Sequence, residues 1–212
     1  MNSKKSLHIT LVLFVLHVVI SYMGMLTIYG PYTVSEVSGM YPHLLTPAGF
    51  TFAIWGIIYV GLALQLGYHY KNTESPIAAT VWQAIGYRLA LVHAATILWL
   101  VAWCQAWLLV ANVFIVLQLV VVLQALIRVG ATHPRGTAFW LSATPLAIYA
   151  GWLCIATVAN TACTLVAHTQ VSLPAESIAK IVVITVVLVT LGTLFQTRLA
   201  AFALPIAWAF WG

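Results

Sequence analysis

Long apolar runs separated by short polar stretches dominate this chain from beginning to end. A bilayer core about 30 Å thick needs roughly 20 apolar residues in a helix, because lipid offers no partner for a bare backbone group. By this measure the pattern predicts seven apolar helices, at residues 8–28, 49–70, 85–104, 107–129, 138–160, 178–197 and 199–212. The last is too short to span, so we expect either a half-inserted helix or a truncated one.

Basic residues near the segment ends predict the orientation, because Lys and Arg stay on the cytoplasmic side of a membrane. With the N-terminus in the cytoplasm, Glu36 and Glu176 lie outside, together with a single basic residue, Lys180. The other basic residues are then all cytoplasmic: Lys4, Lys5, Lys71, Arg88, Arg128, Arg135 and Arg198. We therefore predict an integral membrane protein with a cytoplasmic N-terminus.

The connection at residues 29–48, YGPYTVSEVSGMYPHLLTPA, is long and external in this topology. It carries three prolines, two glycines and three tyrosines, which is not the composition of a flexible linker. We expect either a lid over a site in the bundle or an aromatic segment at the membrane surface. No internal repeat is evident, which argues against the inverted-repeat transporters.

The composition agrees with a membrane protein and disfavours several functions. Of 212 residues, 63% are apolar and 5% are charged, whereas an ordinary globular domain has about 25% charged residues. The basic residues form no stripe, so we expect no nucleic-acid partner. Asp is absent, and the three Glu residues lie between the apolar runs. Ion-coupled transport and Mg²⁺-dependent transfer, which rely on carboxylates, are therefore disfavoured.

Tryptophan is the most unusual component, with nine residues in the chain. Membrane proteins enrich Trp at the two membrane surfaces. Trp55, Trp99 and Trp152 lie too deep in their segments for this explanation. Five others lie near predicted segment ends and are assigned to such interfacial belts: Trp82, Trp107, Trp140, Trp208 and Trp211.

Two predicted helices each carry an aromatic stripe on one face, at spacings of three and four. The stripes are Phe52, Trp55, Tyr59 and Leu62 in residues 49–70, and Tyr149, Trp152, Ala156 and Asn160 in residues 138–160. Small residues beside the first stripe would let another helix approach, within the bundle or in a homodimer: Gly49, Ala53 and Gly56. Periodicity alone favours packing, whereas the polar groups suit a binding site with apolar walls.

Two histidines, His17 and His93, lie deep in separate segments. They could ligate one haem iron or a metal, or each could hydrogen-bond to a neighbouring helix. The three cysteines, Cys104, Cys154 and Cys163, have neither metal-site spacing nor an even number for disulfides, so we expect them to fill apolar space.

Two strings resemble the TspO/MBR family, also called tryptophan-rich sensory proteins or translocator proteins. They are TPAGFTFAIWGIIYVGLAL at residues 46–64 and TPLAIYAGWLCIATVAN at residues 144–160. The family's second helix has a Pro-rich entry and a Trp followed by a Tyr four residues later, like Trp55 and Tyr59. Its Trp-bearing third helix is similar to Leu98 and Trp99. Its fifth helix has Tyr, Trp, Ala and Asn in the order of Tyr149, Trp152, Ala156 and Asn160.

The chain also departs from the family's pattern. Ile148 stands where the fifth-helix Pro precedes the Tyr, Phe52 is displaced by one position, and Thr96 replaces a third-helix Asn. The resemblance covers residues 8–160, and the helices beyond it look like those of longer bacterial relatives. These departures bear on which ligand is bound more than on the fold.

The resemblance implies an all-α protein of the bacterial cytoplasmic membrane. Residues 1–160 would form a five-helix TspO-like bundle with the lid at residues 29–48, and residues 161–212 would add one or two transmembrane helices. A pocket beneath the lid would bind a porphyrin, another tetrapyrrole or a sterol-like lipid, in a sensory or transport-related role without catalysis. The implied ligand-binding residues are Phe52, Trp55, Tyr59, Trp99, Trp103, Tyr149, Trp152 and Asn160, the last as a polar anchor.

Two alternatives come from other functional classes. One is a structural subunit of a larger membrane complex, with its aromatic stripes facing lipid or partners. The other is a haem-bearing redox protein that uses His17 and His93. The expected partners are the bilayer, a small hydrophobic ligand and, through the small-residue stripe, a second copy of the chain. No cofactor is assigned beyond a bound porphyrin or haem.

Overall fold

The computed structural model describes residues 3–41, 48–132, 136–168, 175–197 and 199–211, which form helices and short connections without a strand. The prediction of an all-α protein is therefore confirmed. The long helices of the bundle are α1 (Ser3–Met25), α3 (Ile54–Lys71), α4 (Pro76–Cys104), α5 (Leu108–Ala131) and α6 (Gly136–His168). The other elements are α2 (Val34–Met40), the 3₁₀ turn η1 (Gly49–Ala53), α7 (Ala175–Thr197), η2 (Ala200–Phe202) and α8 (Ala203–Trp211).

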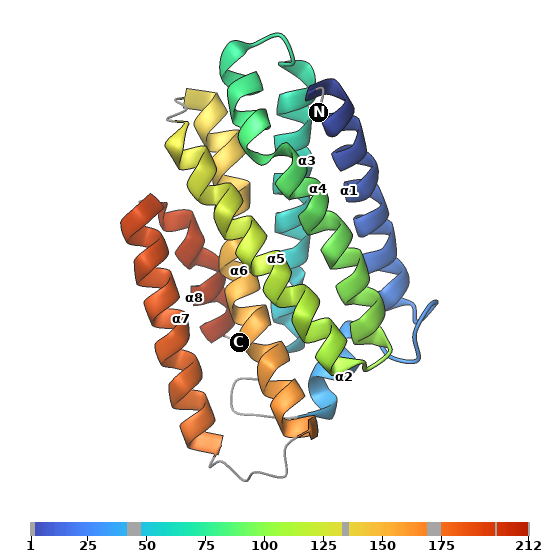
Figure 1. Ribbon diagram of the computed structural model, residues 1–212. Coiled ribbons are helices and arrows are strands. Elements are labelled where there is room, and N and C mark those ends of the chain that lie inside the picture. The colour runs from blue at the N-terminus through green and yellow to red at the C-terminus, as the bar shows by residue number, and fades with distance from the viewer. Residues whose placement is uncertain (1–2, 42–47, 133–135, 169–174, 198, 212) are drawn as a thin grey trace.

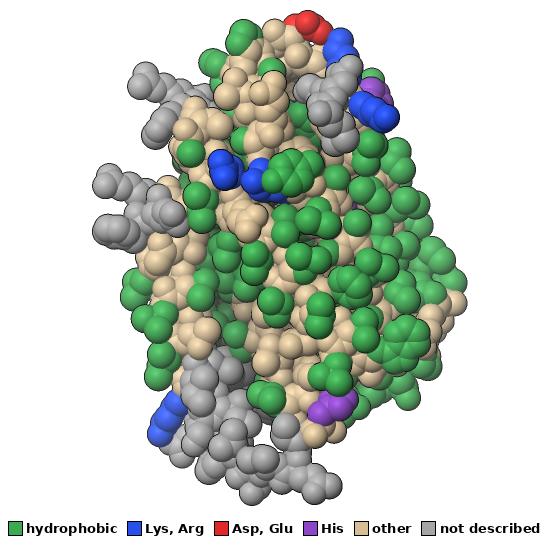
Figure 2. All heavy atoms as spheres, viewed as in Figure 1, with side chains coloured by type: hydrophobic (Ala, Val, Ile, Leu, Met, Phe, Trp, Pro, Cys, Tyr) green, Lys and Arg blue, Asp and Glu red, His purple; other side chains and the backbone are tan. Residues whose placement is uncertain are grey.

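In the described part of the chain, five helical stretches are long and apolar enough to cross a bilayer: Lys4–Met25, Gly49–Lys71, Pro76–Cys104, Leu108–Ala131 and Gly136–His168. Apolar side chains are spread over the flank shown in Figure 2, while Lys and Arg lie in its upper part and at one place near the lower left. Two shorter apolar stretches follow, Ile184–Thr193 and Ala200–Trp211. The short seventh segment is thus confirmed as a helix below spanning length.

Several helices extend beyond their predicted segments. α4 begins at Pro76 rather than at residue 85, because the Ser75 hydroxyl accepts a hydrogen bond from the Ala78 amide at 3.4 Å and Pro suits the first helical turn. α6 continues to His168, so its 33 residues make a helix roughly 50 Å long. α1 lies earlier than predicted, since it ends at Met25. Hydropathy detects only the apolar part of a helix and misses the more polar turns at its ends.

The five long helices form a ring, which Figure 1 shows as a tilted bundle. α1 packs on α4, α4 on α5, α5 on α6, and α6 on α3. The ring closes where α1 meets α3, and contact there is sparser than at the other four junctions. We call this junction the α1–α3 seam. α2 contacts α4 and α6 at the end of the bundle opposite the N-terminus.

The C-terminal helices pack on the outside of α6 (Figure 1). The Phe202 carbonyl of η2 lies directly against Gly151 of α6, where any Cβ would collide with it. The Trp208 indole N–H of α8 donates to the Thr51 carbonyl of η1 at 3.0 Å. The last helix of the described chain is therefore tied to the turn that starts α3.

One tryptophan assigned to an interfacial belt is placed elsewhere. Trp82 is buried, with 3% exposure, and its indole N–H donates to the Ser6 hydroxyl at 2.8 Å. The belt prediction is wrong for Trp82 because α4 begins at Pro76, before the predicted start at residue 85. The indole therefore lies within a helix that packs on α1. Trp107, Trp140 and Trp211 are exposed, as a belt requires.

The small-residue stripe of Gly49, Ala53 and Gly56 lies on the surface. A Cβ added to Gly49 or Gly56 would meet no atom within 4 Å. The stripe therefore does not serve close packing within the described bundle, and its use in a homodimer stays a prediction. The three cysteines are buried and are not joined to one another by disulfides, as expected for apolar filler.

Candidate functional site

A cavity of about 560 Å³ lies at the α1–α3 seam. Its walls come from α1, from Thr33, Val34 and Ser35 at the start of α2, from η1 and α3, and from α4. This volume is within the range of about 300–1,000 Å³ typical of small-molecule sites. α2 lies where the predicted lid was expected. Residues 42–47 of the predicted lid lie outside the described residues.

Aromatic rings form much of the cavity wall. Phe52, Trp55 and Tyr59 of the first predicted stripe reach it, as does Trp99 of α4. The Trp55 ring stacks at 30° on that of Trp99, with centroids 6.4 Å apart, and at 29° on that of Tyr59, with centroids 5.7 Å apart. Such offset-stacked rings present flat apolar faces to whatever lies beside them.

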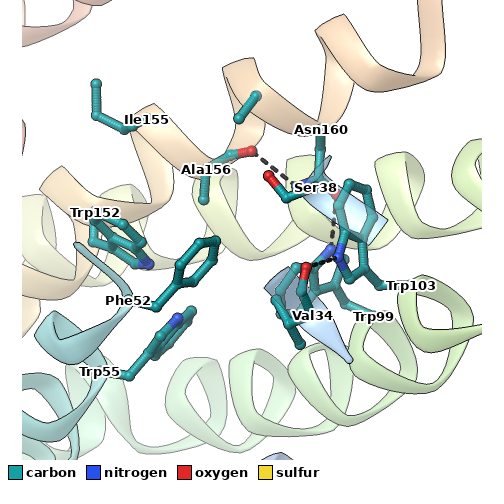
Figure 3. Close-up of a pocket in the computed structure, with 11 residues that line it drawn as sticks. Val34, Ser38, Phe52, Trp55, Trp99, Trp103, Trp152, Ile155, Ala156 and Asn160 are labelled. Carbon is teal, nitrogen blue, oxygen red and sulfur yellow. Dashed lines mark hydrogen bonds between the residues drawn. The ribbon is translucent and has the colours of Figure 1, made fainter. Parts of the chain in front are cut away.

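A small recess of about 30 Å³ continues inward from this wall. It shares Phe52, Trp55 and Trp99 with the larger cavity and adds residues that include Trp103, Trp152 and Asn160. Figure 3 shows Phe52 and Trp55 beside the indole of Trp152, against which both rings pack edge-on, with ring centroids 6.1 and 6.3 Å away. The recess has room for about one water molecule, so a ligand of any size needs the larger cavity.

Asn160 reaches the recess but its amide is engaged by protein groups. Its Oδ1 accepts from the Trp99 indole N–H at 2.9 Å, and its Nδ2 donates to the Ala156 carbonyl at 3.0 Å. Asn160 therefore fixes the orientation of Trp99. The Trp103 indole N–H donates to the Val34 carbonyl at 3.1 Å, which ties α4 to α2.

The unsatisfied donor of the recess is Trp152. This side chain is 2% exposed, and its Nε1 has no hydrogen-bond partner among the described residues. A buried polar group without a partner costs about 1–3 kcal/mol. A ligand oxygen that reached the recess would supply the missing acceptor.

Tyr149, the remaining residue of the predicted set, supports the wall from behind. It is completely buried and packs edge-on against Trp55, with ring centroids 5.9 Å apart. Its hydroxyl lies 2.9 Å from the Thr96 Oγ1, which in turn donates to the Gln118 Oε1 at 2.9 Å. Sequence reasoning missed Gln118, although an amide in the middle of an apolar run was a usable signal.

The α1 wall was also missed from sequence. Val18, Ser21, Tyr22 and Met25 line the larger cavity, and the Tyr59 hydroxyl donates to Ser21 Oγ at 2.8 Å. This bond joins α1 to α3 across the seam. The hydroxyls of Ser21 and Tyr22, near the outer end of the first apolar run, were the available signal. Hydropathy, however, cannot show which face of α1 points inward.

The two deep histidines meet, but not in the geometry of haem ligation. His17 Nδ1 and His93 Nδ1 lie 3.2 Å apart and share a hydrogen bond, and both side chains are completely buried. Bis-histidine ligation requires the iron between the two nitrogens, and rings in direct contact leave no room for it. The expectation of an interhelical hydrogen bond is confirmed, and this pair does not fit a haem.

α2 begins with a capping box. The Thr33 backbone N–H donates to the Glu36 carboxylate at 2.7 Å, and the Glu36 N–H donates to the Thr33 hydroxyl at 3.2 Å. The bond from the Thr33 backbone holds the pKa of the Glu36 carboxyl below its ordinary 4.5. Because this cap keeps seven residues helical, α2 covers the cavity as an ordered element.

Comparison with known proteins places this arrangement in a family. No curated protein and no solved structure matches the chain. A family model described as TSPO-like protein matches residues 7–212, which include the C-terminal helices as well as the five-helix ring. The chain is an integral membrane protein that belongs to the TSPO-like family.

Proposed function

We propose that this protein binds a planar apolar ligand, a porphyrin or other tetrapyrrole or a sterol-like lipid, in the cavity beneath α2. Its role would be sensory or transport-related, without catalysis. The observation that carries the proposal is the cavity of about 560 Å³ whose wall is built from the stacked rings of Trp55, Tyr59 and Trp99. Flat aromatic faces suit a flat ligand.

The chemistry of the lining supports binding. The residues that line the cavity are aromatic, aliphatic or small, and none of them bears a carboxylate. Their hydroxyls are those of Ser21, Tyr22, Thr33, Ser35, Tyr59 and Thr96. General acid–base catalysis most often uses a histidine or a carboxylate, and neither is among the lining residues. A few placed polar groups among apolar walls are instead the pattern of a ligand pocket.

We propose the orientation with a cytoplasmic N-terminus, so that the cavity opens in the outer half of the membrane. The cavity lies beneath α2, at the end of the bundle opposite the N-terminus (Figure 1). The Lys and Arg residues in the short loops support this orientation through the positive-inside rule.

Quenching of Trp fluorescence by protoporphyrin IX tests the proposed ligand class, with the purified protein in lipid nanodiscs. We expect saturable quenching, weakened at least about tenfold by Trp55→Ala, a change equivalent to roughly 1.4 kcal/mol of lost stacking. Trp140→Ala is the matched control, because Trp140 is 62% exposed on α6 and lines neither cavity. Displacement of the porphyrin by a sterol would identify the sterol-like class.

Circular dichroism and thermal unfolding would establish that both variants keep the fold. Quenching that does not saturate, or equal affinity for the wild type and Trp55→Ala, would overturn the assignment of this cavity. Loss of binding in Trp140→Ala alone would place the ligand on the outer surface instead.

A further inference from the structure

The α1–α3 seam holds a second hollow on the other side of the Tyr59–Ser21 bond. It is a groove of about 360 Å³, lined by α1 and α3 in the half of the bundle that contains the N-terminus. Leu11 and Val15 of α1 face Ala63 and Gly67 of α3 across it. None of its lining residues belongs to the cavity beneath α2.

The groove exists because α3 presents small residues there. Ala63 and Gly67 are one helical turn apart and both are exposed. A Cβ added to Gly67 would meet no atom within 4 Å. On the α1 side of the groove, Val15 is 51% exposed, so the groove is apolar and open at the surface of the bundle.

The length of the groove corresponds to one leaflet. Its α3 wall runs from Ala63 to Lys71, which at 1.5 Å per residue is roughly 12 Å. One leaflet is about half of the 30 Å apolar core. A lipid acyl chain lying parallel to the helices would fill this length.

One end of the groove is polar and carries positive charge. His8, Tyr70 and Lys71 line this end. The nearby Glu74 forms an ion pair with Lys4, at 3.0 Å. No carboxylate lines the groove, so no negative charge among its lining residues would repel an anion placed at Lys71.

We propose that the groove binds one anionic phospholipid, with an acyl chain against Ala63 and Gly67 and the headgroup phosphate at Lys71 and His8. The proposal concerns a different site from the ligand cavity and does not depend on what that cavity binds. In the proposed orientation the charged end faces the cytoplasm, the side on which membranes carry anionic lipid.

Native mass spectrometry of the delipidated full chain, titrated with dioleoylphosphatidylglycerol or dioleoylphosphatidylcholine, tests the charged end. We expect one phosphatidylglycerol to bind about fivefold more tightly than phosphatidylcholine, the effect of one lysine near a lipid surface. Lys71→Gln should remove this preference. Arg128→Gln is the matched control, because Arg128 is also exposed and lies in the last turn of α5, which does not line the groove.

Filling the groove tests its apolar part. Gly67→Leu should weaken both lipids at least about tenfold, because the new side chain occupies the space of several methylenes. Gly56→Leu is the control, since Gly56 is exposed on the same helix, also has no atom near its Cβ position, and lies outside the groove. Both substitutions enter open space, and circular dichroism would verify their folding.

Equal affinity for the two lipids would overturn the proposal. So would a Lys71→Gln variant that keeps the wild-type preference, or a Gly67→Leu variant that binds lipid with wild-type affinity. A dimer that Gly67→Leu dissociates would show that a second copy covers the groove. Porphyrin quenching measured on the same variants should stay at the wild-type level, so failure here is distinguishable from failure of the proposed ligand cavity.

Discussion

Gln118 illustrates how a single polar side chain stabilises an apolar bundle. Its Oε1 accepts from Thr96 Oγ1 at 2.9 Å and from the Tyr149 hydroxyl at 3.3 Å, all within the buried core. Three helices, α4, α5 and α6, meet at this cluster. Away from water these groups rely on protein partners: one another and, for Thr96 and Gln118, also a backbone carbonyl of their own helix.

Gln118→Leu should therefore lower the free energy of unfolding by about 1 kcal/mol, the net contribution of a buried hydrogen bond, because Thr96 and Tyr149 keep their other partners. Thermal unfolding in detergent would measure the change. Gln124→Leu is the matched control, because Gln124 is exposed on the same helix. Equal melting temperatures for the two variants would contradict the structural role of Gln118.

Trp152 allows a subtler test of the ligand's chemistry. Trp152→Phe keeps an aromatic ring in the recess but removes the unpartnered indole N–H. For a ligand with a carbonyl or carboxylate oxygen we expect about fivefold weaker binding, or roughly 1 kcal/mol for one hydrogen bond.

A matched ligand without an acceptor should bind Trp152→Phe and the wild type equally. Fluorescence titration of both ligands would separate the two cases. If the substitution weakened both ligands alike, the loss would come from ring packing and not from the N–H.

For single residues, the sequence predicted which side chains lie together but not which hydrogen bonds they form. Spacings of three and four brought Trp55 and Trp152 to one recess, as the stripes indicated. The polar anchor Asn160 is instead occupied by Trp99. Periodicity identifies a face, whereas a hydrogen-bond partner depends on the rotation of two helices about their axes, which a single sequence does not encode in its spacing.

Among the elements, α2 is short and depends on its N-terminal capping box for stability. Thr33→Ala removes the hydroxyl that accepts the Glu36 N–H, and loss of an N-cap hydroxyl costs about 0.5–2 kcal/mol. Because α2 covers the cavity, we expect faster ligand release. Stopped-flow measurement of porphyrin dissociation would detect it. Thr80→Ala, at an exposed Thr of α4, should release ligand at the wild-type rate; equal rates for the two variants would argue against α2 as a lid.

The same cap predicts a pH dependence. A carboxyl whose pKa is lowered on folding contributes stability that is present above its ordinary pKa, 4.5 for Glu36, and is lost as the pH falls through the lower folded value. Ligand dissociation should therefore be constant from neutral pH down to about 5 and accelerate below about 4.5. Glu36→Gln, which keeps an acceptor without a titration, should abolish the acceleration; if it persists, another group controls it.

Helix boundaries were predicted less well than helix existence. α5 lies close to its predicted segment, because it is apolar along its whole length. α4 and α6 extend beyond theirs through stretches of mixed polarity that neighbouring helices bury only in part. α2 was expected only as part of a long loop, either a lid or an aromatic segment at the membrane surface, since a helix of seven residues has no hydropathy signal of its own.

The whole molecule offers a direct test of orientation. Cys104, Cys154 and Cys163 are buried, so labelling of the native chain with a membrane-impermeant maleimide should be weak. In intact cells we expect Gly39→Cys, in α2, to be labelled and Lys4→Cys to be labelled only after permeabilisation. Both positions are exposed. The reverse pattern would invert the proposed topology.

Hydropathy and charge predicted the class of the molecule, its long helices and the short final segment. They did not predict the order of helices around the ring, because every apolar face satisfies lipid equally well. They also did not predict the contact between α8 and η1. This contact depends on the hydrogen bond from Trp208 to the Thr51 carbonyl, two residues far apart in the sequence.

The row of indoles in the cavity wall has a further consequence, for optical spectroscopy. Trp55, Trp99 and Trp103 stack in succession, with ring centroids 6.4 and 6.0 Å apart and ring planes within 30° and 24° of parallel. Transition dipoles at such separations couple, so their absorption bands split and the near-ultraviolet circular dichroism becomes sensitive to their mutual angle. The chain therefore carries its own chromophore array, which would report rearrangement of the cavity wall without any attached probe.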